Sequence, residues 1–80
     1  MDNVYIGQIL LLPYNFAPVG LAPCDGRLLQ INQNMPLFSL IGTNFGGDGT
    51  TTFGLPNYQG LAPKGSLYFI VLNGIFPQRS

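Results

Sequence analysis

The chain has 80 residues, enough for one small domain that buries only about 60–65% of the surface exposed by its unfolded chain. Charged side chains make up 8% of the residues, against roughly a quarter in ordinary soluble domains. With 46% hydrophobic residues and no net charge, copies of the chain do not repel one another, which favours self-association. The three cations are scattered and balanced by three carboxylates, so nucleic-acid binding is not expected.

The apolar segments are too short to cross a membrane. The longest clean run is Leu67–Leu72, whereas a spanning helix needs about 20 apolar residues. Asp2 stands where a signal peptide would have basic residues, and Pro13 interrupts the apolar run Ile9–Leu12. We therefore expect neither membrane insertion nor a cleaved signal peptide.

The first part of the chain predicts a strand followed by a loop. Residues Val4–Leu12 are rich in β-branched, aromatic and other apolar side chains and stop at Pro13, which is typical of a buried β-strand. Residues 14–20 contain proline and glycine, and we expect a loop there with Phe16 in the core.

A tight turn is predicted next. Cys24-Asp25-Gly26 lies between two extended segments, Leu21–Pro23 and Arg27–Ile31. Asp-Gly tolerates positive φ at both residues, so the two segments are expected to form a hairpin. The second segment does not alternate between apolar and polar residues, which indicates burial on both faces or a bulge.

A two-turn helix follows between Asn34 and Gly42. Asn34 suits the N-cap, Pro36 suits the first turn, and Gly42 suits the C-terminal stop. Within the helix the i, i+3, i+4 spacing predicts one apolar stripe facing a sheet, with Phe38 beside it; the stripe residues are Leu37, Leu40 and Ile41.

Residues 43–54 are dense in glycine and threonine and predict a loop. Its glycine spacing is close to that of a phosphate-binding loop, but Asp48 stands where a lysine should contact phosphate. One carboxylate is also too few for a tight calcium site, and the chain has no glutamate. We expect no metal and no cofactor.

The last part predicts a loop over residues 58–66 and then the core strand Leu67–Leu72. Asn73-Gly74 favours a two-residue turn. We expect it either to place Ile75-Phe76 antiparallel to the end of that strand or to bend the strand at a bulge.

These motifs, in this order, resemble the phage tail collar domain, which also occurs in bacterial proteins described as microcystin-dependent. The residues of the shared structural motif are Cys24, Asp25, Gly26, Gly42, Gly46, Gly47, Asp48, Gly49, Leu55 and Pro56. The closing Gly74-Ile75-Phe76-Pro77 is similar to the end of the microcystin-dependent proteins. Leu21 stands where family members commonly have a tryptophan before the Cys-Asp-Gly turn, and Thr50 stands where they often have an arginine after the Gly-Asp-Gly loop. The long histidine-containing variable region of larger relatives is absent, so the chain resembles a minimal collar domain.

The resemblance implies a mainly β fold with one short α-helix, built of hairpins and a glycine-rich loop, as one domain over residues 1–80. It also implies a homotrimer. We expect a structural, self-assembling module of a phage tail or tail-derived fibre, with a stacked filament as a further form. Its partners would be copies of itself and other tail or fibre proteins, in a virion tail, a tail-like particle or an extracellular filament. Predicted self-assembly contacts are Tyr68, Ile70, Ile75 and Phe76.

Two alternatives belong to other function classes. A receptor- or glycan-binding tip module would use the loop tyrosines Tyr14 and Tyr58 together with the threonine-rich loop. Catalysis is not expected, because the chain has neither histidine nor glutamate for acid–base chemistry. Cys24 beside Asp25 is the only conceivable nucleophilic pair, but the carboxylate would raise the pKa of the thiol. With no second cysteine, Cys24 is predicted to be a structural thiol.

Overall fold

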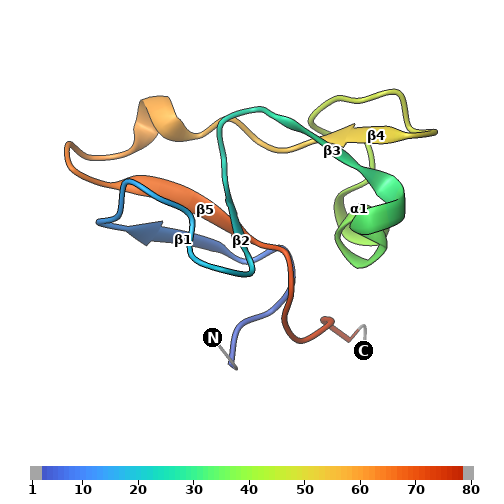
Figure 1. Cartoon of the computed structure of the whole chain (residues 1–80), viewed down its shortest axis with the longest axis horizontal. Helices are drawn as coiled ribbons and strands as arrows, with labels where there is room; N and C mark the ends of the chain where they lie inside the picture. Colours follow the sequence, from blue (N-terminus) through green and yellow to red (C-terminus); the bar gives the residue numbers. More distant parts are fainter. Residues whose placement is uncertain (1–2, 79–80) are drawn as a thin grey trace.

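Two small antiparallel sheets and one short α-helix make up the computed structural model, which describes residues 3–78 (Figure 1). The first sheet has the order β1-β5-β2, formed by Ile9–Leu12, Leu67–Val71 and Leu21–Pro23. The second sheet pairs β3 (Leu28–Gln30) with β4 (Thr52–Gly54). Helix α1 is Met35–Ile41, and the 3₁₀ turns η1 and η2 are Ile31–Gln33 and Gln59–Leu61. The predicted mainly β fold with one short helix is confirmed.

β5 is the central strand of the first sheet, as its composition predicted. Leu10 of β1 lies opposite Phe69, and Ala22 of β2 lies opposite Ile70. Phe69, Ile70 and Val71 are buried because both faces of the strand are covered by apolar side chains. An uncharged, mostly apolar strand is stable in this central position, whereas at a sheet edge it would promote aggregation.

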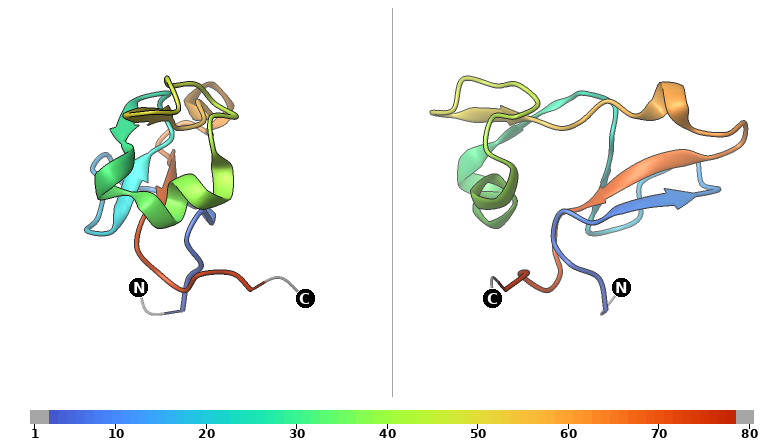
Figure 2. Two further views of the ribbon diagram at one scale, coloured as in Figure 1. Left: turned by 90° about the vertical axis from the view of Figure 1, so that its right-hand side faces the viewer. Right: turned by 180° about the vertical axis from the view of Figure 1, so that it is seen from behind.

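The core has two parts. The main core cluster joins both sheets and the helix; its members are Ile6, Ala22, Cys24, Ile31, Leu37, Phe53, Leu55 and Ile70. The second cluster covers the other face of β5 and consists of Leu21, Phe69 and Val71 with partly buried neighbours. Figures 1 and 2 show α1, β3 and β4 at one end of the long axis and the β1–β5 pair at the other. The main core cluster therefore holds the two ends together.

The predicted strand Val4–Leu12 is wrong in its first half. Gly7 adopts φ 87°, and its N–H donates to the Val71 carbonyl at 2.9 Å. The Val71 N–H donates to the Gln8 carbonyl at 3.0 Å, so two residues face one, which is a β-bulge. Only Ile9–Leu12 continues as β1, and it is an exposed edge strand rather than a buried one.

The predicted hairpin around Cys24-Asp25-Gly26 is also wrong. The two flanking segments separate: β2 pairs with β5, and β3 pairs with β4. The expected burial of Arg27–Ile31 on both faces does not occur, because Leu28 is exposed. Long-range pairing overrides the local turn preference of Asp-Gly.

The predicted helix is confirmed, with changes at its start and along its face. Gly42 ends it with φ 55°, and its N–H donates to the Phe38 carbonyl at 2.8 Å. The Asn34 side chain makes no cap bond and donates instead to the Gln30 carbonyl at 3.0 Å. Leu37 and Ile41 of the predicted stripe pack in or against the main core cluster, as does Phe38, whereas Leu40 is exposed. Phe38 packs against Phe53 of β4, with ring centroids 5.4 Å apart.

Three further expectations fail in detail. The glycine–threonine loop ends earlier than predicted, because Thr52–Gly54 forms β4. Phe16 is exposed rather than part of the core. Of the two outcomes predicted for Asn73-Gly74, the hairpin does not form; the backbone bends over residues 72–74, and Ile75 makes a parallel bridge with Tyr5. The segments on either side of this bridge leave the first sheet on the same side (Figures 1 and 2).

Candidate assembly surface and its supporting motif

The Cys24-Asp25-Gly26 segment leads from the first sheet to the second and is bonded to its neighbours throughout. The Cys24 N–H donates to the Tyr68 carbonyl at 3.0 Å, and the Cys24 carbonyl accepts from the Tyr58 N–H at 2.9 Å. The Gly26 N–H donates to the Pro56 carbonyl at 3.2 Å. These bonds make the segment a connector between sheets.

The Cys24 thiol is fully buried in the main core cluster. Burial raises the pKa of the thiol to about 11, and the Asp25 carboxylate contributes to the rise. The thiol is therefore protonated at neutral pH and poorly suited to act as a nucleophile. Its place in the core matches the structural role expected for Cys24.

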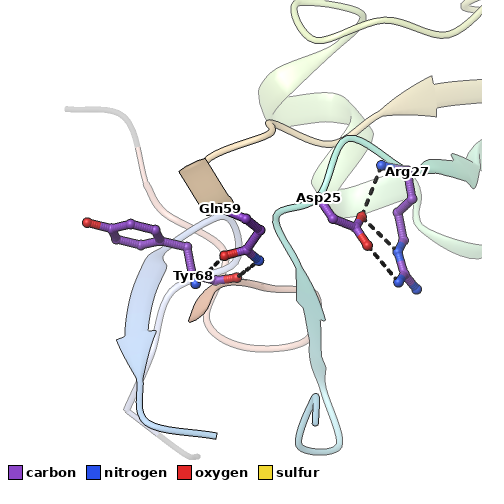
Figure 3. Close-up of polar contacts among 4 residues, drawn as sticks. All are labelled: Asp25, Arg27, Gln59 and Tyr68. Carbon is purple, nitrogen blue, oxygen red and sulfur yellow. Dashed lines mark hydrogen bonds and ion pairs between the residues drawn. The ribbon is translucent and has the colours of Figure 1, made fainter. Parts of the chain in front are cut away.

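Asp25 and Arg27 form a local ion pair on the surface (Figure 3). Asp25 Oδ1 accepts from the Arg27 Nε at 3.0 Å, and Oδ2 accepts from Arg27 Nη2 at 2.9 Å. The Arg27 side-chain bond is the main cause that holds the pKa of Asp25 below its usual range. Both side chains are well exposed, so this pair adds little stability and chiefly fixes the turn after Cys24.

Gln59 continues the first sheet with its side chain (Figure 3). Its Nε2 donates to the Tyr68 carbonyl at 2.9 Å, and its Oε1 accepts from the Tyr68 N–H at 2.9 Å. The Cys24 carbonyl pairs with the Tyr58 N–H and makes no bond to the Tyr68 N–H, which Gln59 satisfies instead. Sequence analysis missed this role, since no local pattern relates residue 59 to residue 68.

Asp48 organises the glycine–threonine loop. Its Oδ1 accepts from the backbone N–H groups of Thr50, Thr51 and Thr52 at 2.8–2.9 Å, and Oδ2 accepts from the Thr51 hydroxyl at 2.8 Å. The backbone bonds, that from Thr52 foremost, hold the pKa of Asp48 well below its usual range. The carboxylate is therefore committed to its own loop.

The remaining motif residues fix the backbone. Positive φ occurs at each of the motif glycines, Gly26, Gly42, Gly46, Gly47 and Gly49. At Gly47 a Cβ would overlap the backbone of Phe53, so the loop can lie against β4 only with glycine there. Leu55 and Pro56 are buried and lead the chain from β4 back into the main core cluster.

The four predicted self-assembly contacts differ in accessibility. Ile70 is 1% exposed, so it belongs to the protein's own core and has no surface left for a partner. Tyr68 is partly buried against the main core cluster. Ile75 and Phe76 are 47% and 43% exposed. Phe76 and Leu40 line a surface hollow of about 520 Å³ with Ser39, Pro77 and Gln78, which we call the Phe76 hollow.

The two tyrosines proposed for ligand binding are in different surroundings. Tyr14 is exposed and stacks on Phe16 with ring centroids 5.4 Å apart. Tyr58 is partly buried and packs edge-on against Phe45 and Tyr68. None of the four best-formed hollows within residues 3–78 is lined by both tyrosines.

Many apolar side chains remain exposed, and sequence reasoning did not single most of them out. The exposed large hydrophobic residues include Ile9, Leu11, Phe16, Val19, Leu28, Met35, Leu61, Ile75 and Phe76. A hydrophobic content of 46% predicts that some apolar side chains are exposed, but only the strand pairing shows which residues they are. Among the described residues, no cluster of three metal-ligating side chains occurs, and no helix is long and apolar enough to span a membrane.

Comparison with protein families gives one match, to the phage tail collar domain over residues 7–63. The chain belongs to this family. Neither the curated proteins nor the solved structures contain a significant match to this collar domain. The matched region includes the whole Cys24–Pro56 motif. The central strand β5 lies outside it, so residues beyond the match complete the first sheet of this collar domain.

Membership of the family indicates a structural role in a phage tail fibre and a place in the virion tail. The collar family is structural rather than enzymatic. The geometry of this collar domain agrees with that role: its motif residues close turns, connect sheets and fill the core.

Proposed function

We propose that this collar domain is a self-assembling structural module of a phage tail or tail-derived fibre, and that it assembles as a homotrimer. The Phe76 hollow is the observation that supports this most directly. Leu40 and Phe76 expose apolar surface there, Ile75 is exposed next to Phe76 in the chain, and among residues 3–78 no charged residue lines the hollow. Exposed apolar surface of this kind marks interaction sites, and a small domain gains stability from covering it.

Substitution at the hollow tests the proposal. We expect the purified chain to have a mass that is a multiple of three 8.7 kDa protomers at micromolar concentration, measured by multi-angle light scattering. Phe76→Lys should abolish that threefold particle, because a lysine buried in an apolar contact loses its hydration. Leu61→Lys adds the same charge at an exposed position outside the hollow and should leave the particle intact. A wild-type monomer at this concentration would refute the proposal.

A filament of stacked trimers, and assembly with other tail or fibre proteins, are extended forms of the same proposal. The low charge of the chain supports them, since stacked copies would not repel one another. Negative-stain microscopy should then show elongated particles at high concentration. Discrete particles alone would limit the assembly to a closed oligomer.

A receptor- or glycan-binding tip module is the second candidate. It is favoured by the exposed Tyr14–Phe16 stack, which borders a surface hollow of about 520 Å³ with Gly65, Ser66 and Leu67. Aromatic faces beside hydroxyl and backbone groups suit the apolar faces and hydroxyls of sugars. A glycan array should give a signal that Tyr14→Ala removes and Leu61→Lys keeps. No signal from the assembled wild-type protein would eliminate this candidate.

A further inference from the structure

The outer edge of β1 has unpaired backbone groups. In the antiparallel β1–β5 pair, alternate residues point their N–H and C=O groups toward the partner strand. The Val71 N–H bonds to the Gln8 carbonyl, so the register directs the backbone groups of Leu10 and Leu12 toward β5. Those of Ile9 and Leu11 point away from it. Within residues 3–78 no backbone or side-chain group bonds to them.

The other sheet edges are largely occupied. On β2 the outward Leu21 N–H donates to the Pro18 carbonyl at 3.0 Å, and Pro23 has no N–H to offer. On β4 the outward Gly54 N–H and Thr52 carbonyl bond within the glycine–threonine loop. On β3 the outward Gln30 carbonyl accepts from the Asn34 side chain. Among the described residues, only β1 has two consecutive outward positions whose N–H and C=O groups are both open.

The β1 edge also lacks the usual protection against pairing. Edge strands are commonly guarded by charged side chains, by an internal proline or by a bulge in the exposed stretch. Between Asn3 and Cys24 there is no charged residue, and the bulge and Pro13 lie at the ends of β1 rather than within it. Ile9 and Leu11 expose 37% and 44% of their surface. The open backbone groups and the apolar side chains thus occur on the same residues.

We propose that the β1 edge binds β1 of a second copy of the chain, antiparallel about a two-fold axis at Leu10. In this register Ile9 of one copy faces Leu11 of the other, and the outward N–H and C=O groups of both residues pair reciprocally. On one face Ile9 packs beside the partner's Leu11, and on the other the two Leu10 side chains meet. The edge is self-complementary. Its outward N–H groups meet C=O groups, its apolar side chains meet apolar side chains, and it has no charge that would repel a second copy.

The pairing rests on the proposed self-assembly and names a second contact, separate from the Phe76 hollow. It would join protomers of different trimers and extend the first sheet across both copies. Leu11→Lys should reduce the wild-type particle to a single trimer, weakening the contact about tenfold or more, because the lysine would lie beside the partner's Ile9. Val19→Lys is the matched control, since Val19 is 99% exposed and lies outside β1.

Light scattering separates this inference from the proposed function. A particle that shrinks in Leu11→Lys and not in Val19→Lys supports β1 pairing. Equal size in wild type and Leu11→Lys, or shrinkage in both variants, overturns it. A wild-type dimer that Leu11→Lys converts into a monomer would support β1 pairing and refute the trimer. If Phe76→Lys dissociates a trimer and Leu11→Lys leaves it unchanged, the result would support the trimer and refute β1 pairing.

Amide hydrogen exchange gives an independent readout on the wild-type chain. The Leu10 and Leu12 amides bond to β5 and should be protected at every protein concentration. The Ile9 and Leu11 amides should exchange fast in dilute solution and become protected as concentration rises. Fast exchange of both at high concentration would overturn the pairing, even if the chain assembles by another surface.

Discussion

Removing the Gln59 side chain is expected to destabilise the fold substantially, although residue 59 lies in a surface turn. Gln59→Ala deletes both hydrogen bonds to the Tyr68 backbone. The Tyr68 carbonyl keeps Cys24 as a donor, so losing that bond costs about 1 kcal/mol or less. The Tyr68 N–H is left in a partly buried site without an acceptor, which costs about 1–3 kcal/mol. The free energy of unfolding should fall by about 1–4 kcal/mol in total.

That loss is large for this chain, because domains of its size are stable by only about 4–12 kcal/mol. Urea denaturation followed by far-ultraviolet circular dichroism, at one fixed protein concentration, measures it. Gln33→Ala is the matched control, since Gln33 is exposed and its side chain makes no hydrogen bond within the described part of the chain. A Gln59→Ala variant within about 0.5 kcal/mol of wild type would refute the reasoning.

Gln59→Glu separates the two bonds. The ionised carboxylate still accepts from the Tyr68 N–H but faces the Tyr68 carbonyl with an oxygen instead of a donor. Protonation restores a donor, so the folded state raises the pKa of the new carboxyl above its unfolded value. The variant should therefore gain stability relative to Gln59→Ala as pH falls below about 5. A constant difference between the two variants across this range would contradict the bonding described for Gln59.

Three further predictions concern the motif. The pKa of Asp48 is lowered in the fold, so the stability advantage of wild type over Asp48→Asn should be full at neutral pH. This advantage should shrink as pH falls below about 4. An advantage independent of pH would contradict the hydrogen bonds described for the loop. Cys24 should resist iodoacetamide at pH 7.5 and react once urea unfolds the chain, and rapid labelling of the native protein would contradict its burial and raised pKa. Gly47→Ala should lower the free energy of unfolding by about 2 kcal/mol or more. Gly60→Ala should leave it unchanged or raise it by up to about 1 kcal/mol, since a Cβ at Gly60 meets nothing. Equal effects of the two substitutions in denaturation would contradict the contact at Gly47.

Elements specified by neighbouring residues were predictable. The helix between Asn34 and Gly42 and the central strand β5 both occur where the sequence placed them. Pro36 and Gly42 act within one turn of the helix end, and an uncharged apolar run is stable only when covered on both faces. Neither inference needed knowledge of a distant partner.

The candidate assembly surface was predictable only in part. Ile75 and Phe76 are exposed as an interface requires, whereas Ile70 is buried because its side chain lies within the main core cluster. The apolar pattern alone does not distinguish side chains that are buried in the core from side chains that remain exposed. The open edge at Ile9 and Leu11 was missed because β1 was expected to be buried.

The sequence by itself determined the family, the β-rich class, the one helix and the residues of the connecting motif. The tertiary structure alone decided which strands pair: Asp25-Gly26 connects two sheets instead of closing a hairpin, and Ile75 bridges to Tyr5 instead of folding back. Turn residues report the φ values that the backbone tolerates, and those preferences act over a few residues. Strand partners are chosen by hydrogen bonds and burial between segments far apart in the chain. The open β1 edge follows from that long-range choice.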